Sequence, residues 1–210
     1  MTVHLATCKH GRFLVMDNDF YIGRLLLRDG VYSDPEVDLF ARLLKPGDTV
    51  VEAGANMGAH AIPLAKMVGD LGRLVCFEPQ PHVYNLLCGN IALNGCHNVA
   101  AYPMGLAREG GTMTLPRELN YNDFQNFGGV PLKKLDGTTG VRIGVIPLDK
   151  LELSALRLLK ADVEGMEIDV LLGARDTIRR CRPYLYIEDD EDDPGPRHKL
   201  LHEMGYRTHD

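Results

Sequence analysis

The chain has 210 residues, of which 45% are hydrophobic and 25% charged, and its formal net charge is −6. This composition is typical of a soluble globular domain and excludes a predominantly disordered chain. The negative charge disfavours nucleic acid as a partner, because phosphate contacts require clustered lysine and arginine side chains.

The five cysteines are odd in number and form no C-x-x-C pair. They indicate reduced, buried thiols in a cytoplasmic protein rather than a disulfide framework or a zinc site. The first ten residues lack the apolar core of a signal peptide. No apolar run approaches the length of a membrane span, and no pattern specifies an oligomeric state.

Residues 1–34 contain short apolar runs, Tyr21–Gly23 and Leu25–Leu27 among them, separated by polar breaks, and predict short strands or a cap before the main fold. A helix is expected from Asp34, because a proline in the first turn and acidic residues at the positive helix end are typical of a helix start. Lys45–Asp48 ends this helix and turns the chain.

From residue 49 onward, predicted strands and helices alternate. Strands are expected over residues 49–52, 73–77, 99–102, 156–161 and 183–187, with a sixth beginning at 206–208. Helices are expected from the end of the 54–58 turn to about residue 68, and over 81–93, 167–180 and 194–204. Pro63 conflicts with the first of these helices and predicts a kink or a late start. The alternation predicts an α/β fold, a doubly wound and mostly parallel sheet with helices on both faces.

An inserted β-hairpin is expected from residues 112–115 and 141–146, which flank an irregular segment over 116–140. A loop of this length inside a compact domain is usually functional or disordered. Its aromatic residues and glycines, Tyr121, Phe124, Phe127, Gly128 and Gly129, suit an acceptor pocket or a lid. Alternatively, the aromatic rings pack onto the sheet.

The strongest local feature is the run Val50–Gly58, in which a strand enters a glycine-containing turn before a helix. Such a turn allows the backbone to approach a ligand closely, and the following N–H groups can face it. Its spacing is G-x-N-x-G rather than the dinucleotide pattern G-x-G-x-x-G. The predicted cofactor-binding residues of this turn are Gly54, Ala55, Asn56 and Gly58.

Two acidic residues complete the predicted cofactor site. Glu78, followed by Pro79, ends the next strand at a spacing suited to accept hydrogen bonds from ribose hydroxyls, the alternative being an exposed acid after a strand. Glu52 precedes the turn, where an acid would repel a pyrophosphate. The same acid would attract the sulfonium and ammonium groups of S-adenosylmethionine (SAM), so the charge favours SAM over a nicotinamide dinucleotide.

The sequence resembles the FkbM-type methyltransferases, within the Rossmann-like class I SAM-dependent methyltransferase fold. The matching segments are Val50–Gly58, Gly72–Pro81, Asn90–Gly95, Asn126–Val130, Leu159–Leu172 and Arg182–Glu188. The resemblance implies one methyltransferase domain over residues 1–210, SAM as cofactor and O-methylation as the usual reaction. The family usually has Asp where this chain has Glu52. Since the family fold ends in a sixth and a seventh strand, we expect the α/β core over 35–210 to lack the last strand.

Methyl transfer from a sulfonium requires alignment and desolvation, and a hydroxyl acceptor benefits from a general base. Asp162 and Glu164 follow the fourth main strand and are the predicted catalytic residues, with Asp162 also beside the cofactor. The alternative is that these acids cap the next helix, a role we expect for Glu167. His60 is a weaker candidate for the base.

A magnesium site could form from Asp162 and the acids Glu188–Asp190. A solvated acidic loop explains the same residues without a ligand, so we predict no metal.

We therefore predict a SAM-dependent methyltransferase that acts on a hydroxyl oxygen of a small molecule, such as a sugar or a natural product. One alternative is an NAD-type oxidoreductase, which Glu52 and the missing middle glycine disfavour. The other is a non-catalytic SAM-binding or interaction domain on the same fold. The orientation of Asp162 and Glu164 distinguishes this last alternative from an enzyme.

Overall fold

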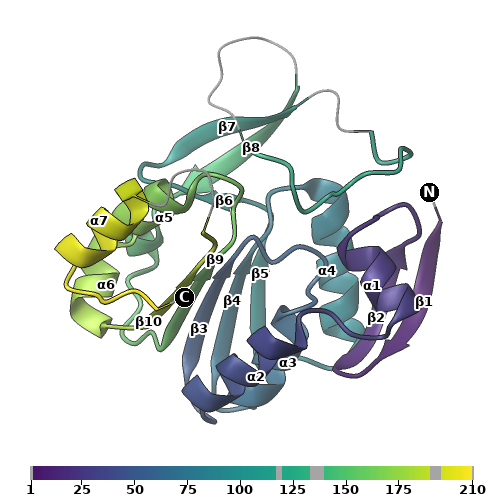
Figure 1. Cartoon of the computed structure of the whole chain (residues 1–210), viewed down its shortest axis with the longest axis horizontal. Coiled ribbons are helices and arrows are strands. Elements are labelled where there is room, and N and C mark those ends of the chain that lie inside the picture. Colours follow the sequence, from purple (N-terminus) through teal and green to yellow (C-terminus); the bar gives the residue numbers. More distant parts are fainter. Residues whose placement is uncertain (1, 117–119, 133–139, 190–194, 210) are drawn as a thin grey trace.

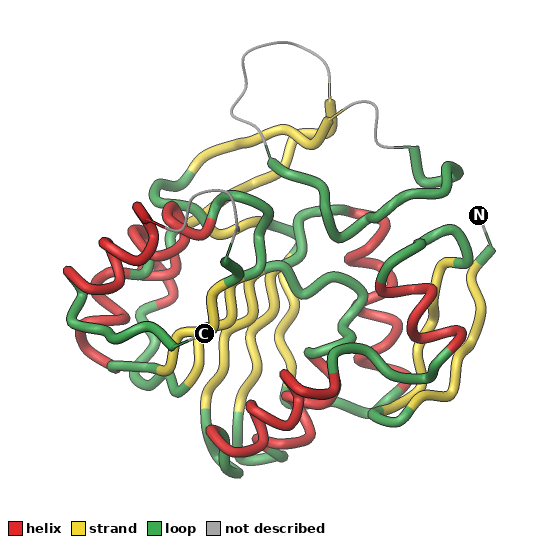
Figure 2. The backbone as a smooth tube through the Cα atoms, in the orientation of Figure 1, coloured by secondary structure: helices red, strands yellow, loops and turns green. Residues whose placement is uncertain are grey.

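The computed structural model describes residues 2–116, 120–132, 140–189 and 195–209. Its centre is a five-stranded parallel sheet with strand order β10-β9-β3-β4-β5. Figure 2 shows the strands of the molecule in yellow. The strands are β3 (Thr49–Ala53), β4 (Arg73–Phe77), β5 (Val99–Tyr102), β9 (Leu158–Ala161) and β10 (Tyr184–Ile187). The chain winds outward from β3 to one edge and then from β9 to the other, which confirms the predicted doubly wound α/β fold. Ligands bind such sheets at the carboxyl ends of the strands, where this order reverses.

Helices cover both faces of the sheet (Figure 1). The core on one face includes residues of α2 (Asp34–Leu43), α3 (Ala61–Val68) and α4 (Pro81–Leu93). The core on the other face includes residues of α5 (Glu167–Gly173), α6 (Arg175–Cys181) and α7 (Gly195–Glu203). The adjacent residues Val50 and Val51 of β3 belong to different cores, because successive side chains of a strand point to opposite faces.

The start of α3 resolves the conflict at Pro63. The helix begins at Ala61, with His60 as the N-terminal capping residue, so Pro63 is its third residue. The first four N–H groups of a helix have no partner within it, and the missing N–H of proline therefore costs no helical hydrogen bond there. The predicted late start is confirmed.

The single helix predicted over residues 167–180 is wrong, because the chain forms α5 and α6 with a break at Ala174. Gly173 lies against the backbone of Ala107, and a Cβ atom at residue 173 would be only 2.1 Å from the Ala107 carbonyl oxygen. The carboxylate of Asp149 accepts hydrogen bonds from the backbone N–H groups of Asp176 (3.0 Å) and Thr177 (2.7 Å). These contacts start a new helix at α6, since such side chains satisfy the free N–H groups of a helix end.

Residues 206–208 form no strand, contrary to the prediction that a sixth strand begins there. In the turn after α7, the backbone N–H of Tyr206 donates to the carbonyl of Leu201. The Tyr206 hydroxyl donates to the carbonyl of Pro183 at 2.9 Å. The guanidinium of Arg182 lies over the Tyr206 ring, 4.2 Å from its centroid. The segment is thus held by its tyrosine side chain rather than by strand pairing.

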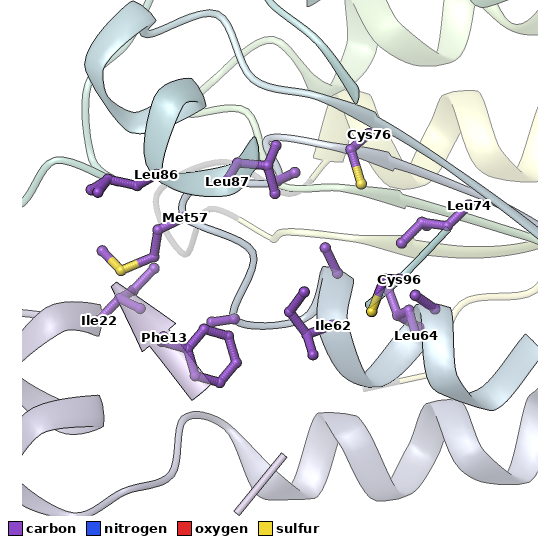
Figure 3. Packing of buried hydrophobic residues seen from close by; sticks show 14 of the residues in the cluster. Phe13, Ile22, Met57, Ile62, Leu64, Leu74, Cys76, Leu86, Leu87 and Cys96 are labelled. Carbon is purple, nitrogen blue, oxygen red and sulfur yellow. The ribbon is translucent and has the colours of Figure 1, made fainter. Parts of the chain in front are cut away.

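The N-terminal residues form an antiparallel hairpin of β1 (Val3–Cys8) and β2 (Gly11–Met16), followed by α1 (Ile22–Arg28). The apolar run Leu25–Leu27 is therefore helical rather than a short strand. Buried Asn90 of α4 accepts a hydrogen bond from the backbone N–H of Leu14 and donates to its carbonyl, as a neighbouring strand would. Figure 3 shows Phe13 of β2 near Ile62 in the core.

The predicted hairpin is confirmed as β7 (Gly111–Pro116) and β8 (Gly140–Ile146), which pair antiparallel. A short strand that the sequence did not predict, β6 (Gly105–Leu106), pairs parallel to β8. Figure 1 shows this small sheet above the central one.

The five cysteines are all free, as predicted. Over the ranges that the structure describes, every helix is too short or too polar to cross a bilayer.

Candidate functional site

A cleft with a volume of about 1260 Å³ opens at the carboxyl end of the central sheet. Its lining includes seven of the predicted site residues: Glu52, Gly54, Ala55, Asn56, Glu78, Asp162 and Glu164. Two others, Gly58 and Pro79, are outside the lining. The fold thus brings most of the predicted cofactor and catalytic residues to one cavity.

The glycine turn packs tightly against the end of β9. Gly54 has a positive φ of 78°, and a Cβ atom there would lie 1.8 Å from the carbonyl oxygen of Asp162. Asn56 adopts the left-handed conformation with φ 49°. At Gly58, φ is 93° and a Cβ atom would lie 2.9 Å from the Leu87 side chain, so this glycine serves packing against α4. The turn therefore requires glycine at Gly54 for both conformation and space.

Glu78 is buried rather than the exposed acid of the alternative interpretation. Its carboxylate accepts hydrogen bonds from the backbone N–H groups of Asn56 (2.9 Å) and Gln80 (2.8 Å). Burial raises the pKa of Glu78 to about 7, although the two N–H donors act in the opposite direction. Since a carboxylate offers about four acceptor positions, two remain for hydroxyl groups of a ligand.

The raised pKa of Glu78 makes a prediction about stability and pH. The folded-state pKa of Glu78, about 7, exceeds the ordinary value of 4.5, so ionisation of this carboxyl group opposes folding. The contribution of protonated Glu78 to the free energy of unfolding is therefore lost as the pH rises through 7. This difference corresponds to up to about 3 kcal/mol in the free energy of unfolding. We expect urea denaturation to give lower stability at pH 8 than at pH 5.5, with a smaller difference in Glu78→Gln. Equal pH dependence in both proteins would contradict the assignment.

A buried lysine links two of the predicted acids. Lys160 on β9 is directly paired with Glu52 on β3, and both residues are 1% exposed. Its ammonium lies 3.7 Å from the Glu52 carboxylate and donates to Asp162 at 3.2 Å. Burial lowers the pKa of Lys160, but the two carboxylates outweigh it and raise the pKa overall, so the side chain stays charged. No role was expected for Lys160 from the sequence, although a lone lysine within the apolar strand Leu158–Ala161 was a usable signal.

Three carboxylates meet beside this lysine. Oxygens of Asp162, Glu164 and Glu188 all lie within 4.8 Å of one another. Burial and the adjacent Asp162 and Glu164 raise the pKa of Glu188 to about 8. The structural role expected for Glu167 agrees with its hydrogen bonds, since its carboxylate accepts from the N–H groups of Val163 and Gly165. The predicted catalytic acids therefore face the cleft.

The hypothetical magnesium set of Asp162 and Glu188–Asp190 is assembled only in part. Asp189 turns toward Arg197 (2.7 Å) and His198 (3.1 Å), away from a shared site with Asp162. Asp190 and the three acids after it lie outside the described residues. Glu188 does meet Asp162, as the hypothesis required, and Glu164 completes this group of three carboxylates in place of Asp189. The absence of a metal stays a prediction.

His60 lies on the cleft wall and is 4% exposed. Its Nε2 atom is 3.4 Å from the Glu36 carboxylate without a well-aligned hydrogen bond. Burial lowers the pKa of His60 strongly, so the imidazole is neutral at pH 7. The rings of Tyr32 and Phe40 contact it, with centroids 5.2 and 5.7 Å away. The sequence did not indicate Glu36 or Tyr32 as cleft residues.

The segment over 120–132 combines both interpretations made from the sequence. Phe127 is fully buried and stacks with Tyr121 at 5.3 Å, so these rings pack into the molecule. Phe124 is exposed, and Gly128 and Gly129 line the cleft. The segment therefore forms part of the cleft wall while its other aromatic rings anchor it.

Comparisons with known proteins match this geometry. The protein-family model described as the methyltransferase FkbM domain matches residues 52–208 of this chain. Methyltransferase sdnD of Sordaria araneosa is 31% identical over 59% of this chain and 59% of its own length. Methyltransferase 1 of Beauveria bassiana is 30% identical over 62% and 60%. A crystal structure of methyltransferase FkbM from Methylobacillus flagellatus has a TM-score of 0.53 at 17% identity, over 80% of this chain and 44% of that one. The predicted Rossmann-like methyltransferase fold is thereby confirmed, and this chain spans about 60% of the length of the two curated relatives.

Proposed function

Because this chain belongs to the FkbM methyltransferase family, we propose that it transfers a methyl group from SAM to a hydroxyl oxygen of a small molecule. The observation that carries the proposal is the meeting of the glycine turn, Glu78 and Asp162 in one cleft. The two curated relatives carry methyltransferase names, which support the reaction class.

The acidic side chains and the glycine turn of the cleft support SAM as the cofactor. Gly54 lets the turn pack directly against the end of β9 beside Asp162, and buried Glu78 retains free acceptor positions for ribose hydroxyls. Glu52 and Asp162 offer two carboxyl groups against the single ammonium of Lys160, which favours a cationic ligand and disfavours the pyrophosphate of NAD. These residues would hold SAM, which supplies an activated methyl group when bound.

The side chains at the end of β9 fit the remaining catalytic requirements. Good alignment of reacting groups accounts for roughly 7–11 kcal/mol of such barriers, and a general base contributes about 10²–10⁴ in rate. Lys160 fixes the Asp162 carboxylate, and Glu188 and Glu164 lie next to it. We assign Asp162 as the acceptor of the hydroxyl proton, with Glu164 as the second catalytic acid.

The acceptor is proposed to be a small molecule such as a sugar or a natural product, methylated in the cytoplasm without a metal. A role in nucleic-acid methylation is disfavoured by the net charge of −6.

The substitution Asp162→Asn tests this assignment. It keeps the shape of the side chain but removes the base, so we expect methyl transfer to slow by about a hundredfold. The affinity for S-adenosylhomocysteine, measured by calorimetry, should change little. Asp176→Asn on the exposed surface of α6 is the matched control and should retain full activity. Unchanged turnover of a defined acceptor by Asp162→Asn would remove Asp162 from the catalytic residues.

A further inference from the structure

Two exposed aromatic rings, Phe20 and Phe124, contact each other outside the cleft lining, and Tyr21, the next residue after Phe20, lines the cleft. Phe20 and Phe124 are 42% and 66% exposed, and their ring centroids lie 5.6 Å apart. Tyr21, which is 51% exposed, lines the cleft itself. Clusters of exposed apolar side chains often mark binding sites, whereas single scattered ones are common on any protein surface. We call these three residues the aromatic platform.

The platform is held in place by hydrogen bonds between two distant segments. The backbone N–H of Phe20 donates to Gln125, and that of Gln125 donates to Asn18. The buried amide of Asn18 donates to the carbonyls of Tyr121 (2.8 Å) and Asp123 (2.6 Å). Residues before α1 and residues of the 120–132 segment are therefore joined, so the platform exists before a ligand arrives. Preorganised contacts of this kind reduce the entropy lost on binding.

The platform continues into the cleft. The ring of Tyr21 meets that of Tyr32 edge to face, with centroids 6.2 Å apart, and both residues line the cavity. An aromatic surface thus runs from the platform into the cleft that Asp162 also lines. A ligand that reaches Asp162 from solvent can rest on this surface.

The charge of the cleft limits what such a ligand carries. Its lining has seven carboxylate side chains and three lysine or arginine side chains. Two of the three cations, Lys160 and Arg197, already pair with acids. A phosphate or carboxylate on the acceptor would therefore meet an excess of acidic over basic side chains.

We propose that Phe20, Tyr21 and Phe124 bind the acceptor by stacking against an apolar ring face, and that this acceptor carries no anionic group. The inference rests on the proposed function, because it names the class of hydroxyl compound that the same site methylates. Aromatic contacts of this kind favour flat or ring-shaped apolar surfaces.

The test uses the full chain loaded with S-adenosylhomocysteine and three matched probes. They are 4-nitrophenyl β-glucoside, methyl β-glucoside without the aromatic ring, and 4-nitrophenyl β-glucuronide with an added carboxylate. We expect saturation-transfer NMR titrations to show the first probe binding roughly tenfold more tightly than either of the others. Replacing both Phe20 and Phe124 by alanine should remove the advantage of the aromatic ring. Leu71→Ala, at a residue that is 91% exposed and outside the cleft lining, is the matched control and should keep it.

Each result decides the proposal. Equal affinity for the first two probes, equal affinity for the glucuronide, an undiminished preference in the double variant, or no binding of any probe would overturn it. If the chain fails to bind S-adenosylhomocysteine at the outset, the proposed function fails instead, so the two failures are distinguishable.

Discussion

Gly54→Ala is expected to lower the free energy of unfolding by more than about 4 kcal/mol and to abolish binding of S-adenosylhomocysteine. An alanine at a φ of 78° costs about 1–2 kcal/mol by itself. The larger effect comes from the new Cβ atom, which would lie 1.8 Å from the backbone carbonyl of Asp162. Backbone cannot move aside as a flexible side chain can, so the turn must separate from β9. Urea denaturation and calorimetry measure the two losses.

Gly95→Ala separates the conformational cost from the collision. Gly95 has a positive φ of 63°, but no atom lies within 4 Å of the position of its Cβ. This control should lose only about 1–2 kcal/mol and bind S-adenosylhomocysteine normally. Equal destabilisation by the two substitutions would show that the contact between the turn and β9 does not determine the requirement for glycine at residue 54.

Lys160→Met is expected to destabilise the fold by about 1–3 kcal/mol, because it leaves buried Glu52, whose pKa burial raises to about 7, without its cation. The double variant Glu52→Gln with Lys160→Met removes both charges and should recover most of this loss. Denaturation midpoints and slopes in urea, compared among the wild type and these two variants, measure both effects. A single variant as stable as the wild type would show that the pair contributes nothing.

The double variant also separates stability from the site. In the wild type, Lys160 also pairs with Asp162, which is partly exposed at the carboxyl end of β9, and the double variant lacks this contact. We therefore expect the double variant to fold while methyl transfer stays slow. Recovery of turnover together with stability would show that Lys160 only neutralises Glu52.

Local sequence determined which parts of the fold were predictable. The bounds expected for β4, α4 and β5 agree with the structure, because each is an apolar run or an apolar helical face between clear turn residues. The break at Ala174 was not predictable, since it depends on Asp149, which reaches α6 from 27 residues away. The prediction of a strand at residues 206–208 was wrong for a related reason, because the Tyr206 side chain donates a hydrogen bond to distant Pro183.

The residues of the site were likewise predictable only where local sequence determined their positions. Spacing along one chain segment placed Gly54, Asn56 and Glu78 correctly in relation to successive strands, and they meet in the structure. The link from Glu52 to Lys160 requires the register of β3 against β9, which no local pattern provides. The proximity of Glu36 to His60 likewise arises only when α2 packs against α3.

We propose above all that this cleft binds SAM through Glu78 and the glycine turn. The most direct measurement is a calorimetric titration of the wild type and Glu78→Gln with S-adenosylhomocysteine, with NAD as the control ligand. We predict that the wild type binds S-adenosylhomocysteine and not NAD, and that Glu78→Gln binds it at least about tenfold more weakly through the loss of charge-assisted hydrogen bonds. Binding of NAD, or no binding of S-adenosylhomocysteine by the wild type, would contradict the account.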